Sequence, residues 1–253
     1  MTGLYLHYFL AGEDKSEFVF KDVLPGKYQL EVIQDNWCWE KEAIEVDVSS
    51  KDVNNIEFVQ KGYQLDLTLS HPAEIEWGLE GSNVPREKKS LEKGSHELCL
   101  TKPGVYSIKP ISCFKFEKET YKFDTAQPKR LDMNAVAFGL KGAIYASEKN
   151  DDITIKAIEG DKQTGMLTWI WTVFRELTFI VLAVTARYVG EDNKDPKYKY
   201  KYEYVHYAKA NQQVEFRLTS GGLFFYPQTV SAQVAQTQEC FQSLTKVIAR
   251  AGL

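Results

Sequence analysis

Three tryptophans are the residues of this chain whose type and spacing could bind a ligand directly. Trp37 and Trp39 lie two residues apart, and Trp77 follows in a later segment. Because the flat apolar face of an indole ring can stack on a sugar, the three tryptophans suggest a carbohydrate-binding β-sandwich. The alternative is core packing, which the sequence favours for the first two, since they align with Leu223 and Phe225 in an internal repeat.

Side chains suited to catalysis are scattered along the chain. Four histidines stand singly, at His7, His71, His96 and His206. The pair His96-Glu97 begins like the zinc-binding motif H-E-x-x-H but continues without a second histidine. With neither a nucleophile elbow nor a glycine-rich phosphate loop, the sequence predicts no enzyme, no catalytic residue, no cofactor and no metal site.

Lysines alternate with tyrosines over residues 197–202, a pattern that resembles a platform for single-stranded nucleic acid. A strand with buried tyrosines and solvated lysines fits the same pattern. The chain has 31 basic and 35 acidic residues, a net charge of −4 and a pI near 5.7. Because this balance offers no attractive field for a polyanion, we expect a strand and no nucleic-acid partner.

The four cysteines stand at Cys38, Cys99, Cys113 and Cys240, without a C-x-x-C pair. Buried free thiols are one interpretation of them. A disulfide between Cys99 and Cys113, which lie closest in sequence, is the other. A tight hairpin centred on Pro103-Gly104 would place Ile108 opposite Cys99, which argues against that bridge.

A repeated turn indicates the elements that position these residues. Pro25-Gly26-Lys27-Tyr28 recurs 78 residues later as Pro103-Gly104-Val105-Tyr106, and alternating strand patterns follow both. A third copy lacks the Pro-Gly, but residues 28–48 align without a gap on 214–234. Apolar positions are kept while polar ones change, which predicts an all-β chain of tandem Ig-like or prealbumin-like sandwiches.

The repeat divides the chain into modules. We expect a first β-sandwich over residues 1–60, with an incomplete or non-native N-terminal part, and a second over 61–134. A third covers 135–240 and contains an insertion at about 161–196. Residues 241–253 are expected to begin a further module.

The insertion is one atypical hydrophobic segment. Met166–Val189 runs for 24 residues without Gly or Pro. A transmembrane helix is one interpretation, opposed by Arg175 and Glu176 near the middle, each of which costs roughly 2.5–3.5 kcal/mol at a bilayer centre. A packed strand or helix and a segment foreign to the native protein are the others.

Short motifs resemble known families. Phe18-Val19-Phe20 through Leu24-Pro25-Gly26-Lys27-Tyr28 is similar to the core of carboxypeptidase-regulatory-like, or prealbumin-like, domains. A further set, read in order, resembles the nodal modulator family: Asn36-Trp37-Cys38-Trp39, Lys61-Gly62-Tyr63, Leu69-Ser70-His71, Lys102-Pro103-Gly104-Val105-Tyr106, Phe224-Phe225-Tyr226-Pro227 and Ala251-Gly252-Leu253. The resemblance covers about 17–158 and 197–253.

That resemblance implies a non-catalytic lumenal scaffold of the endoplasmic reticulum membrane. It implies nicalin and a small multispanning membrane subunit as partners, in a translocon-associated complex for multipass membrane proteins, and a link to Nodal signalling. The family's signal peptide, most of its sandwiches and its C-terminal anchor are not found in this chain. We therefore expect an internal fragment whose membrane association comes through the parent protein's anchor.

Overall fold

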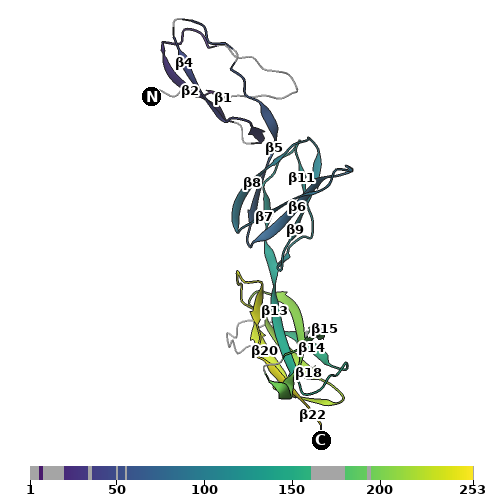
Figure 1. Cartoon of the computed structure of the whole chain (residues 1–253). Helices are drawn as coiled ribbons and strands as arrows, with labels where there is room; N and C mark the ends of the chain where they lie inside the picture. The colour runs from purple at the N-terminus through teal and green to yellow at the C-terminus, as the bar shows by residue number, and fades with distance from the viewer. Residues whose placement is uncertain are drawn as a thin grey trace, which may run out of the picture.

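The computed structural model describes residues 6–7, 20–33, 36–49, 51–54, 56–160, 180–192 and 195–252. Nearly all of its regular structure is β-strand. Figure 1 shows three β-rich bodies in a row, with the two chain ends at opposite ends of the molecule. Two long strands, β5 and β13, each run from one body into the next (Figure 1).

The first body, called the first unit, is a three-stranded sheet. Its order is β1-β2-β4, with β1 at Leu6–His7, β2 at Gly26–Ile33 and β4 at Ala43–Val48. The last two strands pair antiparallel and place Leu30 opposite Ile44. Leu30 is buried, as the alternation in this strand predicts.

The second sandwich packs two sheets face to face around a leucine-rich core. One sheet has the order β11-β9-β6-β7: Tyr121–Asp124, Val105–Ile111, Ala73–Leu79 and Glu87–Leu91. The other has the order β12-β5-β3, with β8 also on β5: Leu131–Met133, Gln60–Leu69, Trp37–Trp39 and Gly94–Leu100. Leu65, Leu67 and Leu69 alternate into the core between these sheets.

The third sandwich is built in the same way around a larger core. One sheet has the order β16-β17-β13-β22-β19: Arg187–Glu191, Tyr200–Lys209, Ala135–Ala146, Val247–Ala251 and Leu223–Tyr226. Two short strands also pair with β13: β10 at Lys115–Phe116 and β21 at Phe241–Ser243. The facing sheet has the order β15-β14-β18-β20: Ile180–Thr185, Thr154–Gly160, Gln213–Thr219 and Thr229–Gln233.

The gapless repeat is visible in strand register. Leu30 pairs with Ile44 in β2–β4, and Phe216 pairs with Val230 in β18–β20, which are the positions that the alignment equates. Phe216 is fully buried, as expected for a core position. Val32 is only half-buried, because the first unit has a single sheet in the described residues.

The predicted insertion needs correction in its second half. Residues 161–179 lie outside the described part of the chain. From Ile180 onward, however, β15 pairs along its whole length with β14, and β16 pairs with β17. This half therefore forms strands of the third sandwich, in line with the packed-strand interpretation, and its β-branched residues suit a pleated sheet. Among the described residues, the structure contains no helix long and apolar enough to cross a membrane.

The predicted last boundary is also wrong. Residues 241–253 were expected to open a further module, but β21 and β22 pair parallel with β13 inside the third sandwich. In the second sandwich, β12 pairs parallel with β5 in the same manner. The last strand of a sandwich thus lies beside its first strand, a long-range pairing that local sequence patterns do not reveal.

Candidate functional site at the junctions between sandwiches

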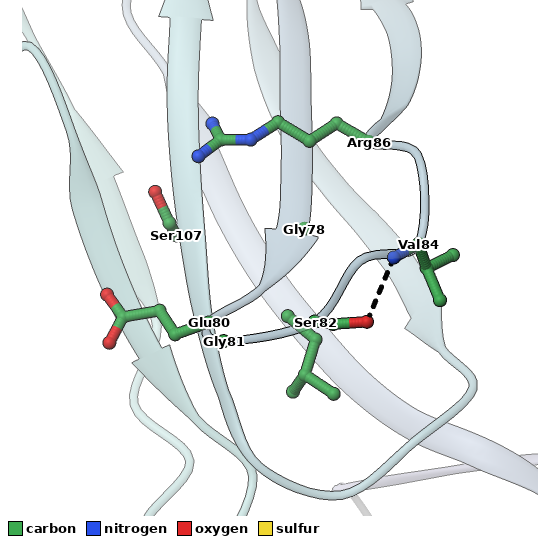
Figure 2. Close-up of a pocket in the computed structure, with 8 residues that line it drawn as sticks. Gly78, Glu80, Gly81, Ser82, Val84, Arg86 and Ser107 are labelled. Carbon is green, nitrogen blue, oxygen red and sulfur yellow. Dashed lines mark hydrogen bonds between the residues drawn. The ribbon is translucent and has the colours of Figure 1, made fainter.

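Figure 2 shows a hollow beside the turn after β6 in the second sandwich, with a volume of about 290 Å³. Its charged groups bind one another or close neighbours: Arg86 Nη1 lies 3.2 Å from Glu76 Oε1, and Lys122 Nζ lies 3.0 Å from Glu80 Oε1. The dashed contact in the figure is the Ser82 hydroxyl, which accepts a hydrogen bond at 3.1 Å from a backbone N–H two residues on. These contacts stabilise a turn and do not resemble a catalytic arrangement.

A second hollow, of about 420 Å³, lies over β5 and β8. Arg130 donates hydrogen bonds from Nε to Thr68 Oγ1 at 2.8 Å and from Nη2 to Ser95 Oγ at 2.7 Å. His96 Nε2 lies 2.6 Å from the Glu92 carbonyl oxygen. Across the described residues, no three His, Cys, Asp or Glu side chains are grouped to hold a metal ion.

The three tryptophans do not form one flat platform. Trp77 is 7% exposed and packs in the core of the second sandwich. Trp37 and Trp39 are half-buried, with ring centres 5.6 Å apart and ring planes tilted by 41°. This arrangement does not favour the sugar-stacking interpretation, because one ring is buried and the other two are tilted against each other.

The repeated Pro-Gly-x-Tyr turns form the same local contact. The Tyr28 hydroxyl donates to the Leu24 carbonyl at 2.7 Å, and the Tyr106 hydroxyl donates to the Lys102 carbonyl at 2.9 Å. Gly104 has a φ of +136°, a conformation that glycine adopts readily. These residues therefore brace the start of a strand, and their role is structural.

The cysteine predictions are both wrong. Cys38 is bonded to Cys99, with Cα atoms 5.9 Å apart, and Cys113 is bonded to Cys240, with Cα atoms 5.3 Å apart. The segment at Pro103-Gly104 does not close a hairpin, because it carries the chain from β8 in one sheet to β9 in the other. Each disulfide instead lies at a junction: Cys38 on β3 bonds to Cys99 on β8, and Cys113, between β9 and β10, bonds to Cys240, directly before β21.

The first junction joins the first unit to the second sandwich. Strand β3 pairs with the start of β5, and a bulge at Lys61 brings Cys38 opposite Gly62. Two residues further along β5, Gln64 pairs with Cys99 on β8. The disulfide therefore joins β8 of the second sandwich to β3, a strand that lies in the chain between β2 and β4 of the first unit.

The second junction repeats this arrangement between the second and third sandwiches. Strand β10 pairs with the start of β13, with the same bulge, and Lys115 lies opposite Ala137. Two residues further, Gly139 pairs with Tyr207 on β17. By register, Lys115 is equivalent to Cys38, and Tyr207 is equivalent to Cys99. The Lys115 ammonium lies 5.1 Å from the centre of the Tyr207 ring, so a cation–π contact stands where the first junction has a disulfide.

His71 lies inside the second junction. It is 1% exposed, and its ring centre lies 4.6 Å from that of Phe114 and 5.2 Å from that of Phe138 on β13. Its Nδ1 lies 3.0 Å from Ser70 Oγ, which also accepts a hydrogen bond from Ala135 N–H. Burial lowers the pKa of His71, and the backbone of Thr237 offsets part of this change.

His206 has a structural position in the third sandwich. Its Nε2 lies 2.7 Å from Glu159 Oε1, and Gln212 Nε2 donates to Glu159 Oε2 at 2.9 Å. Because His206 and Gln212 each bind one oxygen of the Glu159 carboxylate, the arrangement is a part-buried polar network within the fold.

Sequence reasoning missed Lys115 and Tyr207. The repeat spacing of 78 residues places Cys38 on Phe116, one residue away from the true equivalent. The signal that could have found the pair is the loss of one residue between the two copies. Strand register was needed to detect it, because only the pairing of β3 with β5 and of β10 with β13 shows which residues are equivalent.

Comparisons with known proteins agree with this architecture. Residues 64–137 match the family described as NOMO Ig-like domain. Residues 10–60 match the family described as BOS complex subunit NOMO1-like, second beta sandwich domain.

Curated relatives extend well beyond this chain. BOS complex subunit NOMO3 from Homo sapiens is 30% identical over 260 residues, which cover 93% of this chain and 21% of the relative. BOS complex subunit NOMO1 from Mus musculus is 30% identical over 268 residues, which cover 96% of this chain and 22% of the relative. This chain thus spans about a fifth of the length of these relatives.

Among solved structures, a streptococcal ancillary pilin covers 91% of this chain and 76% of its own, at 9% identity and a TM-score of 0.26. A putative adhesin from Bacteroides ovatus has a TM-score of 0.28 at 8% identity, over 62% of this chain and 73% of its own. Both scores are too low to indicate a shared arrangement.

Proposed function

We propose that this chain, which is a nodal modulator-like protein, acts as a non-catalytic scaffold segment of a membrane-protein complex. The observation that carries the proposal is the pair of braced junctions, each with a disulfide and a shared strand. A chain of sandwiches fixed in this way holds surfaces at set distances, which is a mechanical task.

The two disulfides support a lumenal location. All four cysteines are paired, and disulfides persist in oxidising compartments such as the lumen of the endoplasmic reticulum. The relatives are named as subunits of the BOS complex. We therefore propose that the chain lies on the lumenal side of the endoplasmic reticulum membrane, where the parent protein's anchor would hold it.

The proposed partners are nicalin and a small multispanning membrane subunit, in the translocon-associated complex that assists multipass membrane proteins. A link to Nodal signalling is a further part of this proposal. Support comes from the resemblance to the family together with the similarity to BOS complex subunits.

A recovery experiment tests the location and the partners. The chain would be expressed behind an added signal sequence, cross-linked in intact microsomes and recovered through a tag. We expect nicalin to be recovered, and we expect cysteines that react with maleimide only after reduction. A matched control without the signal sequence should recover no nicalin and should expose reactive thiols. Equal recovery from both would refute the lumenal scaffold.

A further inference from the structure

The far end of the third sandwich repeats the pairing found at both junctions, without their bulge. Strand β19 pairs with β22 and places Phe224 opposite Arg250. Gly252 N–H donates to the Gly222 carbonyl at 3.2 Å, as Gln64 N–H donates to the Asn36 carbonyl at 3.0 Å in the first junction. By register, Phe224 is therefore the third member of the set that contains Cys38 and Lys115.

The first two members of this set contact the next sandwich. Cys38 bonds to Cys99 on β8, and Lys115 lies over the ring of Tyr207 on β17. Phe224 differs, because the described residues hold no following sandwich for it to contact, and its side chain is 71% exposed. Its ring rests beside Gly252, where an added Cβ would lie 3.0 Å from the ring.

We propose that Phe224 is the contact on which a further β-sandwich of the same kind docks, through that sandwich's equivalent of strands β8 and β17. The proposal rests on continuity with two interfaces in this chain that use the same position. Since phenylalanine forms neither a disulfide nor an ion pair, the facing residue should be apolar, aromatic or cationic.

Tyr226 provides an internal control for exposure alone. It is 80% exposed on the same face of β19, two residues beyond Phe224. Its equivalents by register are Glu40 and Glu117, which are exposed and stand outside the pairs that cross the junctions. Both aromatic side chains are therefore exposed, but only Phe224 is equivalent to the residues that make contact across the two junctions.

A chimera tests this geometry with a known sandwich. Ala249 is equivalent to Gln60, so the chain through Ala249 would be followed by a second copy of residues 61–134. In that copy Cys113→Ser leaves the second Cys99 as its one thiol. Oxidised glutathione would serve as oxidant, and free thiols would be counted by mass spectrometry after alkylation.

With Phe224→Cys, we expect the new thiol to bond to the copied Cys99 and leave no free thiol. With Tyr226→Cys, we expect two free thiols. Two free thiols in the Phe224→Cys chimera, or equal bonding by both variants, would overturn the proposal.

A second chimera shows whether the copied sandwich can fold and form this disulfide behind a junction that the structure contains. It joins the same copy after Ala135, behind the established second junction, and carries Lys115→Cys together with Cys113→Ser in the native part, because the partner Cys240 is absent from this chimera. If this chimera forms the disulfide while the Phe224→Cys chimera does not, the proposal is overturned. Concentration-dependent dimerisation of the original chain that Phe224→Ser abolishes would also overturn it, by assigning the surface to a second copy.

Discussion

The Lys115 ammonium lies 5.1 Å from the centre of the Tyr207 ring, at the positions where Cys38 and Cys99 are bonded one junction earlier. The same two positions therefore make contact across both junctions, through a disulfide in the first and a cation–π contact in the second. The shared strands β5 and β13 fix the register, so the side chains at these positions must meet whatever their type.

This equivalence predicts an engineered disulfide. Lys115→Cys with Tyr207→Cys should form a bond in air-oxidised protein, because the register places the two Cβ atoms as in the first junction. Mass spectrometry of the alkylated protein before and after reduction would detect it. Glu117→Cys with Tyr207→Cys is the matched control and should leave two thiols. Bonding in the control, or its absence in the test pair, would contradict the equivalence.

Removing the native bond at the second junction should loosen the third sandwich. Cys113→Ser with Cys240→Ser is expected to lower the free energy of unfolding by about 2–5 kcal/mol, since the bond closes a long loop. Urea unfolding followed by fluorescence measures this change. The corresponding change at Cys38 and Cys99 should leave the third sandwich's transition in place. An unchanged midpoint after loss of the second-junction bond would argue against its bracing role.

Two buried tyrosines should respond in opposite directions to loss of the hydroxyl. Tyr106→Phe removes the bond to the Lys102 carbonyl and should lower the free energy of unfolding by about 1 kcal/mol. Tyr204 is 1% exposed, burial raises its pKa to about 12, and its hydroxyl has no partner within the described chain. Tyr204→Phe should therefore raise the free energy of unfolding by about 1 kcal/mol. Thermal unfolding of both variants measures these changes, and an equal loss of stability in the two variants would refute the prediction.

His71 should make the second junction sensitive to acid. Burial lowers its pKa in the folded state, so the unfolded chain binds more protons below about pH 6.5. Its contribution is fully present above that value and is lost as the pH falls through 6.5 towards the lower folded pKa. Urea unfolding from pH 7.5 to 5 should show a weaker decline in His71→Asn. An identical decline in both proteins would exclude this histidine as the cause.

The sequence by itself determined the strands and their repetition. Leu65, Leu67 and Leu69 alternate with polar residues in the sequence and form a core face in the structure, because successive side chains of a strand point to opposite sides. Alternation also separated the buried Tyr202 from the solvated side of its strand. These features depend on residues close together in the chain, and local patterns record them.

Only the tertiary structure decided which distant strands meet. The disulfide partners are 61 and 127 residues apart, and the sandwich's last strand lies beside its first. The surface on which Phe224 stands exposed was fixed in the same way, by the pairing of β19 with β22. Such contacts arise when two sheets pack and a bulge shifts the register, and neither event changes the residue pattern of the strands involved.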